Sequence, residues 1–126
     1  MLPAAHRLTD PAAFSSTVRA GRRAGSRTLV VHVHTDGMSL HPPRVGLVVG
    51  KAVGNAVVRN RVKRRLRHQV LPLLGTLPPG ASVVLRALPA AGPASSAELA
   101  EELTSALARC LKGRSVPTLE QTGTPR

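Results

Sequence analysis

Aromatic side chains are almost absent from this sequence of 126 residues, which has no Trp, no Tyr and a single Phe, Phe14. Proteins that bind single-stranded nucleic acid commonly stack bases on aromatic rings, which contributes about 1–3 kcal/mol per base. This chain can form at most one such stack. Any affinity for nucleic acid must therefore come mainly from contacts between cationic side chains and phosphates.

Cysteine and long apolar runs are also scarce. Cys110 is the one cysteine, which excludes an internal disulfide and a metal cluster built from cysteines. No run of about 18 apolar residues occurs, so the sequence predicts no transmembrane helix and no membrane partner. Residues 1–14 lack the continuous apolar segment of a secretory signal. We therefore expect a cytoplasmic location.

Acidic residues are few, with 6 Asp and Glu against 18 Lys and Arg, which gives a formal net charge of +12. This excess favours a nucleic-acid partner over small acidic molecules. The acidic residues are scattered and form no paired-carboxylate motif, so no catalytic residue is assigned. His32 and His34 could be half of a metal site, but no third ligand stands at a recognisable spacing. We expect no metal bound by this chain alone.

Residues 51–68 combine an apolar period of four with a high density of positive charge. Val58, Val62, Leu66 and Val70 predict a helix with one buried stripe, and Asn55 is a suitable N-cap. Arg59 borders the stripe, whereas we expect a second set of arginines to face solvent: Arg61, Arg64, Arg65 and Arg67. Like charges three and four residues apart repel each other, and a polyanion would relieve that repulsion.

The remaining pattern predicts one sheet with helices packed on it. A short helix should begin at Pro11 after an Asp10 cap and run to about Arg19, with Gly21 as its C-terminal stop, and residues 20–27 should form a basic loop. Strands are expected at 28–35, 44–49 and 82–88. A last helix should follow the capping box of Ser95 and Glu98 and end at Gly113. We expect a single domain at 1–113 and a disordered tail at 114–126.

Residues 44–68, RVGLVVGKAVGNAVVRNRVKRRLRH, resemble the signature of the bacterial ribonuclease P protein subunit. The core of this signature runs from Gly54 to Arg64. Agreement extends to RLT at 7–9, to Phe14, to residues 19–22 and to PPGASVVL at 78–85. The resemblance covers about residues 3–112.

This resemblance implies an α/β (α+β) two-layer sandwich of about four strands in the order αβββαβα. In that family the basic helix lies in a left-handed crossover between parallel strands, as in the second domain of a small-subunit ribosomal protein. The implied function is binding to the catalytic RNA of ribonuclease P. The RNA, with its Mg²⁺ ions, cuts the 5′ leader from precursor tRNA. No obligate protein partner is expected.

The resemblance also implies two groups of site residues. The RNA-binding group lies in and before the basic helix: Lys51, Asn55, Arg59, Asn60, Arg61, Lys63, Arg64, Arg65 and Arg67. The second group would line a cleft for the leader between the first helix and the sheet: Phe14, Val18, Leu29 and His32. The alternative is a non-catalytic module that binds RNA or DNA, either like a ribosomal protein or nucleoid-associated.

Overall fold

The structure is a computed structural model that describes residues 4–35 and 41–115, with side chains as far as Leu111. Its elements are α1 (Pro11–Ala20), β1 (Arg22–Gly25), β2 (Leu29–Thr35), β3 (Arg44–Val48), α2 (Ala56–Val70), β4 (Ala81–Ala87) and α3 (Ser96–Ser115). The expected α/β class and the order αβββαβα are confirmed. α3 continues beyond Gly113, where the sequence predicts its end. The rest of the expected tail, 116–126, lies outside the described residues.

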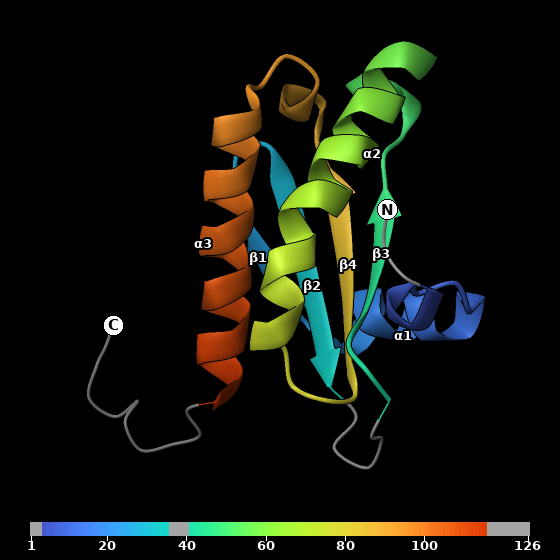
Figure 1. Ribbon diagram of the computed structural model, residues 1–126, viewed down its shortest axis with the longest axis vertical. Helices are drawn as coiled ribbons and strands as arrows, with labels where there is room; N and C mark the ends of the chain where they lie inside the picture. Colours follow the sequence, from blue (N-terminus) through green and yellow to red (C-terminus); the bar gives the residue numbers. More distant parts are fainter. Residues whose placement is uncertain (1–3, 36–40, 116–126) are drawn as a thin grey trace.

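The four strands form one mixed sheet in the order β1-β2-β4-β3. β2 is antiparallel to β1 and β4, and β3 is parallel to β4. In Figure 1, α2 and α3 lie in front of this sheet, β3 points upward, and β4 lies to the left of β3. The path from β3 through α2 to β4 is therefore a left-handed crossover, the rare hand for such a connection.

β1 corrects the expectation of a loop at residues 20–27. It pairs with β2 so that Arg23 lies opposite His32 and Ala24 opposite Val31. Only Ala24 is buried in this edge strand. Two arginines and a glycine in four residues give no apolar alternation, so pairing with β2 determines the conformation.

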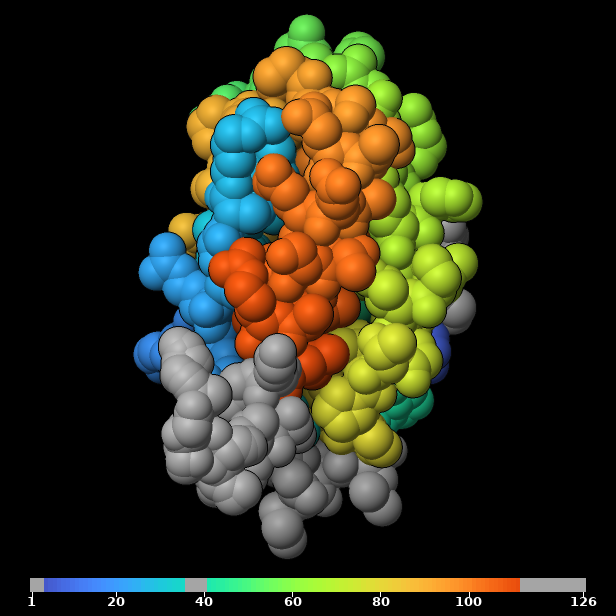
Figure 2. Space-filling view, turned by 90° about the vertical axis from the view of Figure 1, so that its left-hand side faces the viewer, coloured from blue at the N-terminus to red at the C-terminus, as the bar shows by residue number. Residues whose placement is uncertain are grey.

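The core lies between the sheet and the layer of α2 and α3. Leu99, Leu103 and Leu107 of α3 are buried there, as their spacing predicts. The expected capping box is present, since Ser95 N donates to Glu98 Oε1 and Glu98 N donates to Ser95 Oγ. In Figure 2, α3 fills the surface between the β1–β2 hairpin and α2.

α1 covers part of the opposite face of the sheet. Val45 and Leu47 of β3 pack in the core, so Gly46 between them points the other way. A Cβ on Gly46 would lie 2.3 Å from Cε2 of Phe14, which places the Phe14 ring on that opposite face. Asp10 caps α1 through Ala12 N, and α1 ends at Ala20, as expected.

The end of α1 approaches β2 closely. A Cβ on Gly21 would lie 2.6 Å from the carbonyl oxygen of Val33, so a side chain there would force α1 away from the sheet. Among the described residues, no helix combines the length and the apolar character needed to cross a membrane.

Candidate nucleic-acid interface

α2 rests on the core through the stripe that its sequence predicts. Val62, Leu66 and Val70 are completely buried. Asn55 is the N-cap, because its side-chain oxygen accepts a hydrogen bond of 3.0 Å from Val58 N. The polar residues of α2 therefore occupy its two flanks and its outer face.

The outer face and one flank of α2 carry free cations. Asn60 and Arg64 are exposed, and Lys63 and Arg67 are half-buried on the flank away from α3. Lys51, also exposed, precedes the helix. Within the described part of the chain, no carboxylate lies within ion-pair distance of Lys63, Arg64 or Arg67. No described residue therefore neutralises the positive charge of this surface.

The other flank of α2 contradicts the expectation that Arg61 and Arg65 face solvent. Arg61 Nη2 donates to Gly92 O at 3.2 Å, and Arg65 Nη1 donates to Ala94 O at 3.1 Å. Both side chains are half-buried. The segment that leads into α3 runs beside this flank and offers unpaired backbone carbonyls, a long-range contact that helical periodicity cannot reveal.

Arg59 is also bound to the backbone. Its Nε donates to Gly54 O at 3.1 Å, just before the helix. Gly54 has a φ of 156°, which favours glycine. The sharp turn into α2 is thus held by Arg59 from one side and by the Asn55 cap from the other.

The residues expected in a leader cleft divide between the two faces of the sheet. Phe14 and His32 lie on the face that carries α1, and Val18 of α1 is 38% exposed. Leu29, in contrast, is completely buried in the core on the α2–α3 side. The prediction that Leu29 lines the same cleft as His32 is therefore wrong, because strand residues an odd number apart point to opposite faces.

His32 is buried on the α1 face between two arginines that the sequence analysis did not single out. Arg23 is its partner on β1, and Arg86 of β4 pairs with Val30, the next β2 residue on that face. Burial, then the charges of Arg86 and Arg23, lower the pKa of His32. No group in the described residues hydrogen-bonds to either ring nitrogen of His32. Folding therefore favours the neutral form of its imidazole.

A strip of this sheet face remains open beside α1. Val48 of β3 is 36% exposed and pairs with Arg86, the one exposed residue of β4. An arginine within the otherwise apolar sequence of 81–87 is the signal that could have identified Arg86. The open strip thus places the exposed apolar side chain of Val48 beside the cation of Arg86, a combination that suits a nucleotide chain.

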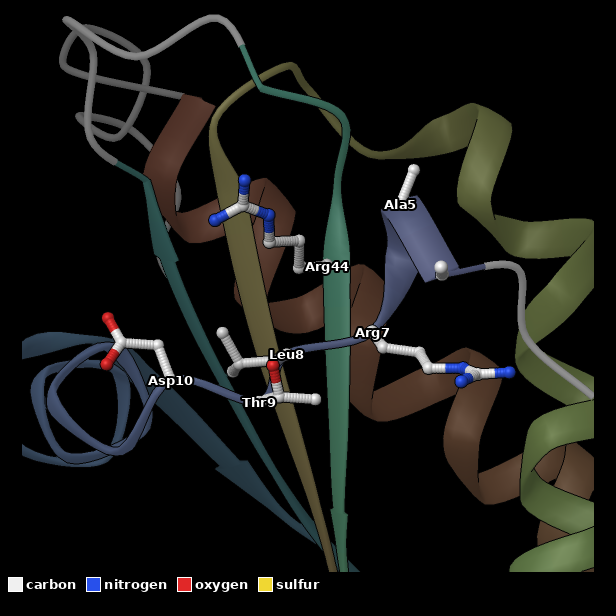
Figure 3. A pocket seen from close by; sticks show the side chains of 7 residues that line it. Ala5, Arg7, Leu8, Thr9, Asp10 and Arg44 are labelled. Atoms are coloured by element: carbon white, nitrogen blue, oxygen red, sulfur yellow. The ribbon is translucent and has the colours of Figure 1, made fainter.

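A further basic region lies at the edge of β3. Arg7 and Arg44 border a pocket of about 300 Å³ that Asp10 also lines. Figure 3 shows Arg44 and Asp10 on the side of β3 that carries α1, whereas Arg7 points toward α2. Arg7 is held there because the next residue, Leu8, donates its N–H to Val45 O at 3.0 Å. Cations therefore flank β3 on both sides.

Three of the described carboxylates are engaged in structural contacts, whereas the fourth, Glu101, is exposed on α3. Asp10 caps α1, and Glu98 forms a 2.8 Å ion pair with Arg27 in addition to its capping bond. Glu102 accepts hydrogen bonds from Thr28. No group of three His, Cys, Asp or Glu side chains that could hold a metal ion occurs within residues 4–35 and 41–111.

Known proteins resemble this chain in sequence and in fold. The family model described as Ribonuclease P matches residues 2–111. The ribonuclease P protein component of Streptomyces bikiniensis is 54% identical over 120 residues, which cover 90% of this chain and 98% of that protein. The corresponding protein of Nocardioides sp. is 54% identical over 110 residues, covering 86% and 94%. The Staphylococcus aureus RNase P protein structure matches with a TM-score of 0.68 at 24% identity, covering 90% and 98%, and thus shares the fold.

Proposed function

Because this chain belongs to the ribonuclease P protein family, we propose that it binds the catalytic RNA and the 5′ leader of precursor tRNA. The family acts in tRNA processing, and a ribonuclease P protein component implies partnership with ribonuclease P RNA. The proposal concerns which surfaces of this chain meet each RNA and what they contribute.

The unneutralised cations of α2 are the observation that carries the proposal. Arg64 is exposed, Lys63 and Arg67 lie beside it, and none has a carboxylate partner in the described residues. In this proposal the catalytic RNA supplies the missing negative charge, and the release of its counterions drives binding. Lys51, Asn55, Arg59 and Asn60 extend the contact around the start of the helix.

The open sheet face would hold the leader. Phe14 offers the single ring, Val18 and Val48 offer exposed apolar surface, and Arg23 and Arg86 offer charge on either side of His32. One stacked base with phosphate contacts is the binding mode that this composition supports.

Catalysis in this proposal belongs to the RNA. Asp10, Glu98 and Glu102 are occupied by caps, an ion pair and the bonds to Thr28, and exposed Glu101 belongs to no group of three possible ligands, so the described carboxylates do not fit a Mg²⁺ site. Mg²⁺ would be held mainly by the RNA, and the protein would neutralise charge and position the substrate. A cytoplasmic location and the absence of an obligate protein partner belong to the same proposal.

Capture of the chain with its bound RNA, followed by sequencing, tests the proposal. One dominant RNA, the catalytic RNA of ribonuclease P, is expected together with precursor tRNAs. A broad mixture of RNA, or duplex DNA bound equally well, would instead support a ribosomal-protein-like or nucleoid-associated module.

A further inference from the structure

Three side chains along one flank of α2 donate to alternate carbonyls of residues 92–96, the segment that leads into the first residue of α3. Arg61, Arg65 and Gln69 are four residues apart, so they lie in a row with a rise of about 6 Å per step. They donate to Gly92 O at 3.2 Å, Ala94 O at 3.1 Å and Ser96 O at 2.9 Å, respectively. A move of four residues along α2 therefore corresponds to a move of two residues along the segment 92–96.

The segment is fixed from its other side by the turn that precedes α2. A Cβ on Gly92 would lie 2.5 Å from the carbonyl oxygen of Val53, so the two backbones are in close contact. Ala91 and Ala94 are buried beside them. The carbonyls of Gly92 and Ala94 therefore lie between α2 and the core, and their bonds to Arg61 and Arg65 are partly buried, whereas the bond from Gln69 to Ser96 O is exposed.

Arg61 and Arg65 thus differ from Arg64, although all three carry the same charge on the same helix. Arg64 is exposed and has no partner among the described residues, whereas Arg61 and Arg65 are half-buried. The Nε atom of Arg61 is itself buried. If the Nη atom that either clamped arginine places on a carbonyl turned to a phosphate instead, that carbonyl would lose a charged donor, which is unfavourable.

We propose that Arg61, Arg65 and Gln69 form a carbonyl clamp that fixes α2 against the start of α3 and makes no contact with RNA phosphates. The clamp rests on the proposed function in one respect, that α2 binds the catalytic RNA. The clamp residues are positioning residues, because they hold the helix in place while Arg64 and its neighbours make the contact. The second arginine of the Arg59-Asn60-Arg61 sequence then serves the fold rather than the ligand.

Two double variants with the same loss of charge separate these roles. Arg61→Gln with Arg65→Gln removes two members of the clamp, and Arg64→Gln with Arg67→Gln removes two cations outside it. Thermal unfolding of the full chain and its affinity for ribonuclease P RNA at several salt concentrations are measured for both. The clamp variant should lose about 5 °C or more in Tm, with an unchanged slope of log affinity against log salt.

The second variant should behave in the opposite way. Its Tm should stay the same or rise slightly, because like-charge repulsion is removed. Its salt slope should become shallower by roughly 0.7–0.9 for each phosphate that the variant no longer binds. A clamp variant with an unchanged Tm and a shallower slope would overturn the clamp. If neither slope changes, the proposed RNA contact of α2 fails, whereas a lower Tm of the clamp variant still supports the clamp.

Gln69→Ala keeps the test decisive if the clamp double variant does not fold. This substitution removes the third donor without changing the charge. A Tm lower by about 2–4 °C with an unchanged salt slope supports the clamp. An unchanged Tm for Gln69→Ala, with Arg65→Gln alone reducing only the salt slope, overturns it.

Discussion

Glu102 is the residue that fastens α3 to the turn between β1 and β2. Its carboxylate accepts hydrogen bonds of 2.6 Å from Thr28 Oγ1 and 2.9 Å from Thr28 N. Thr28 is completely buried. The bond from the Thr28 hydroxyl, then the bond from its N–H, lower the pKa of Glu102 against the opposing effect of desolvation. The charged form of Glu102 is therefore stabilised by folding.

We predict that Glu102→Gln lowers the free energy of unfolding by about 1 kcal/mol near neutral pH, because an amide oxygen accepts more weakly and the site is partly solvated. Since the folded pKa is depressed, this contribution is complete above the unfolded pKa of about 4.3 and is lost as the pH falls through the folded value. Urea unfolding at neutral and acidic pH measures it. Exposed Glu101→Gln is the control and should leave the free energy of unfolding unchanged at both pH values. If Glu102→Gln lowers the free energy of unfolding equally at neutral and acidic pH, the charge of Glu102 does not contribute to stability.

Substitution of Phe14 tests whether its aromatic ring on the open sheet face binds the leader. We predict that Phe14→Leu weakens binding of precursor tRNA to the holoenzyme by about 1–3 kcal/mol and leaves mature tRNA binding unchanged, because only the precursor has a leader to stack. Leucine keeps an apolar contact with Gly46, so the packing of α1 should survive. Equal reductions for both tRNAs, with a lower Tm, would show that Phe14 acts only through packing.

At the scale of elements, the start of α3 depends on a reciprocal pair of capping bonds. Glu98 N donates to Ser95 Oγ at 3.1 Å, and Ser95 N donates to Glu98 Oε1 at 2.9 Å. We predict that Ser95→Ala reduces the stability by about 1 kcal/mol, as expected for removal of an N-cap. Thermal unfolding measures this decrease. Ser105→Ala, at an exposed position of the same helix, should be neutral or slightly stabilising; a similar decrease there would remove the capping explanation.

The three helices could be predicted from the sequence because each has a cap and an apolar stripe of its own. Asp10, Asn55 and Ser95 all cap where expected. β1 could not be predicted, since the strand exists only through its pairing with β2. The clamped positions of Arg61 and Arg65 depend likewise on a segment about thirty residues away in sequence. Leu29 is different, because strand alternation alone would have separated it from His32.

At the scale of the whole molecule, the proposed function assigns cleavage to the catalytic RNA and binding to this chain. We predict that the purified chain, free of RNA, cleaves precursor tRNA at no specific site, because three of its described carboxylates are held in structural contacts and the fourth, Glu101, is exposed and has no acid–base partner among the described residues. Incubation with end-labelled precursor tRNA, with and without added ribonuclease P RNA, measures this. Specific cleavage by the protein alone would contradict the assignment of catalysis to the RNA.

Other segments of the chain bind backbone groups on each of the two outer strands of the sheet. On β1, Arg109 Nη2 donates to Gly25 O at 3.1 Å. On β3, Leu8 N donates a hydrogen bond to Val45 O, and the backbone of Arg7 forms a parallel β-bridge with Val45. Unpaired N–H and C=O groups on an edge strand can pair with strands of other molecules, which leads to aggregates and fibrils. Because backbone groups on both edges are partly occupied, pairing of an edge strand with a second copy of this chain is disfavoured.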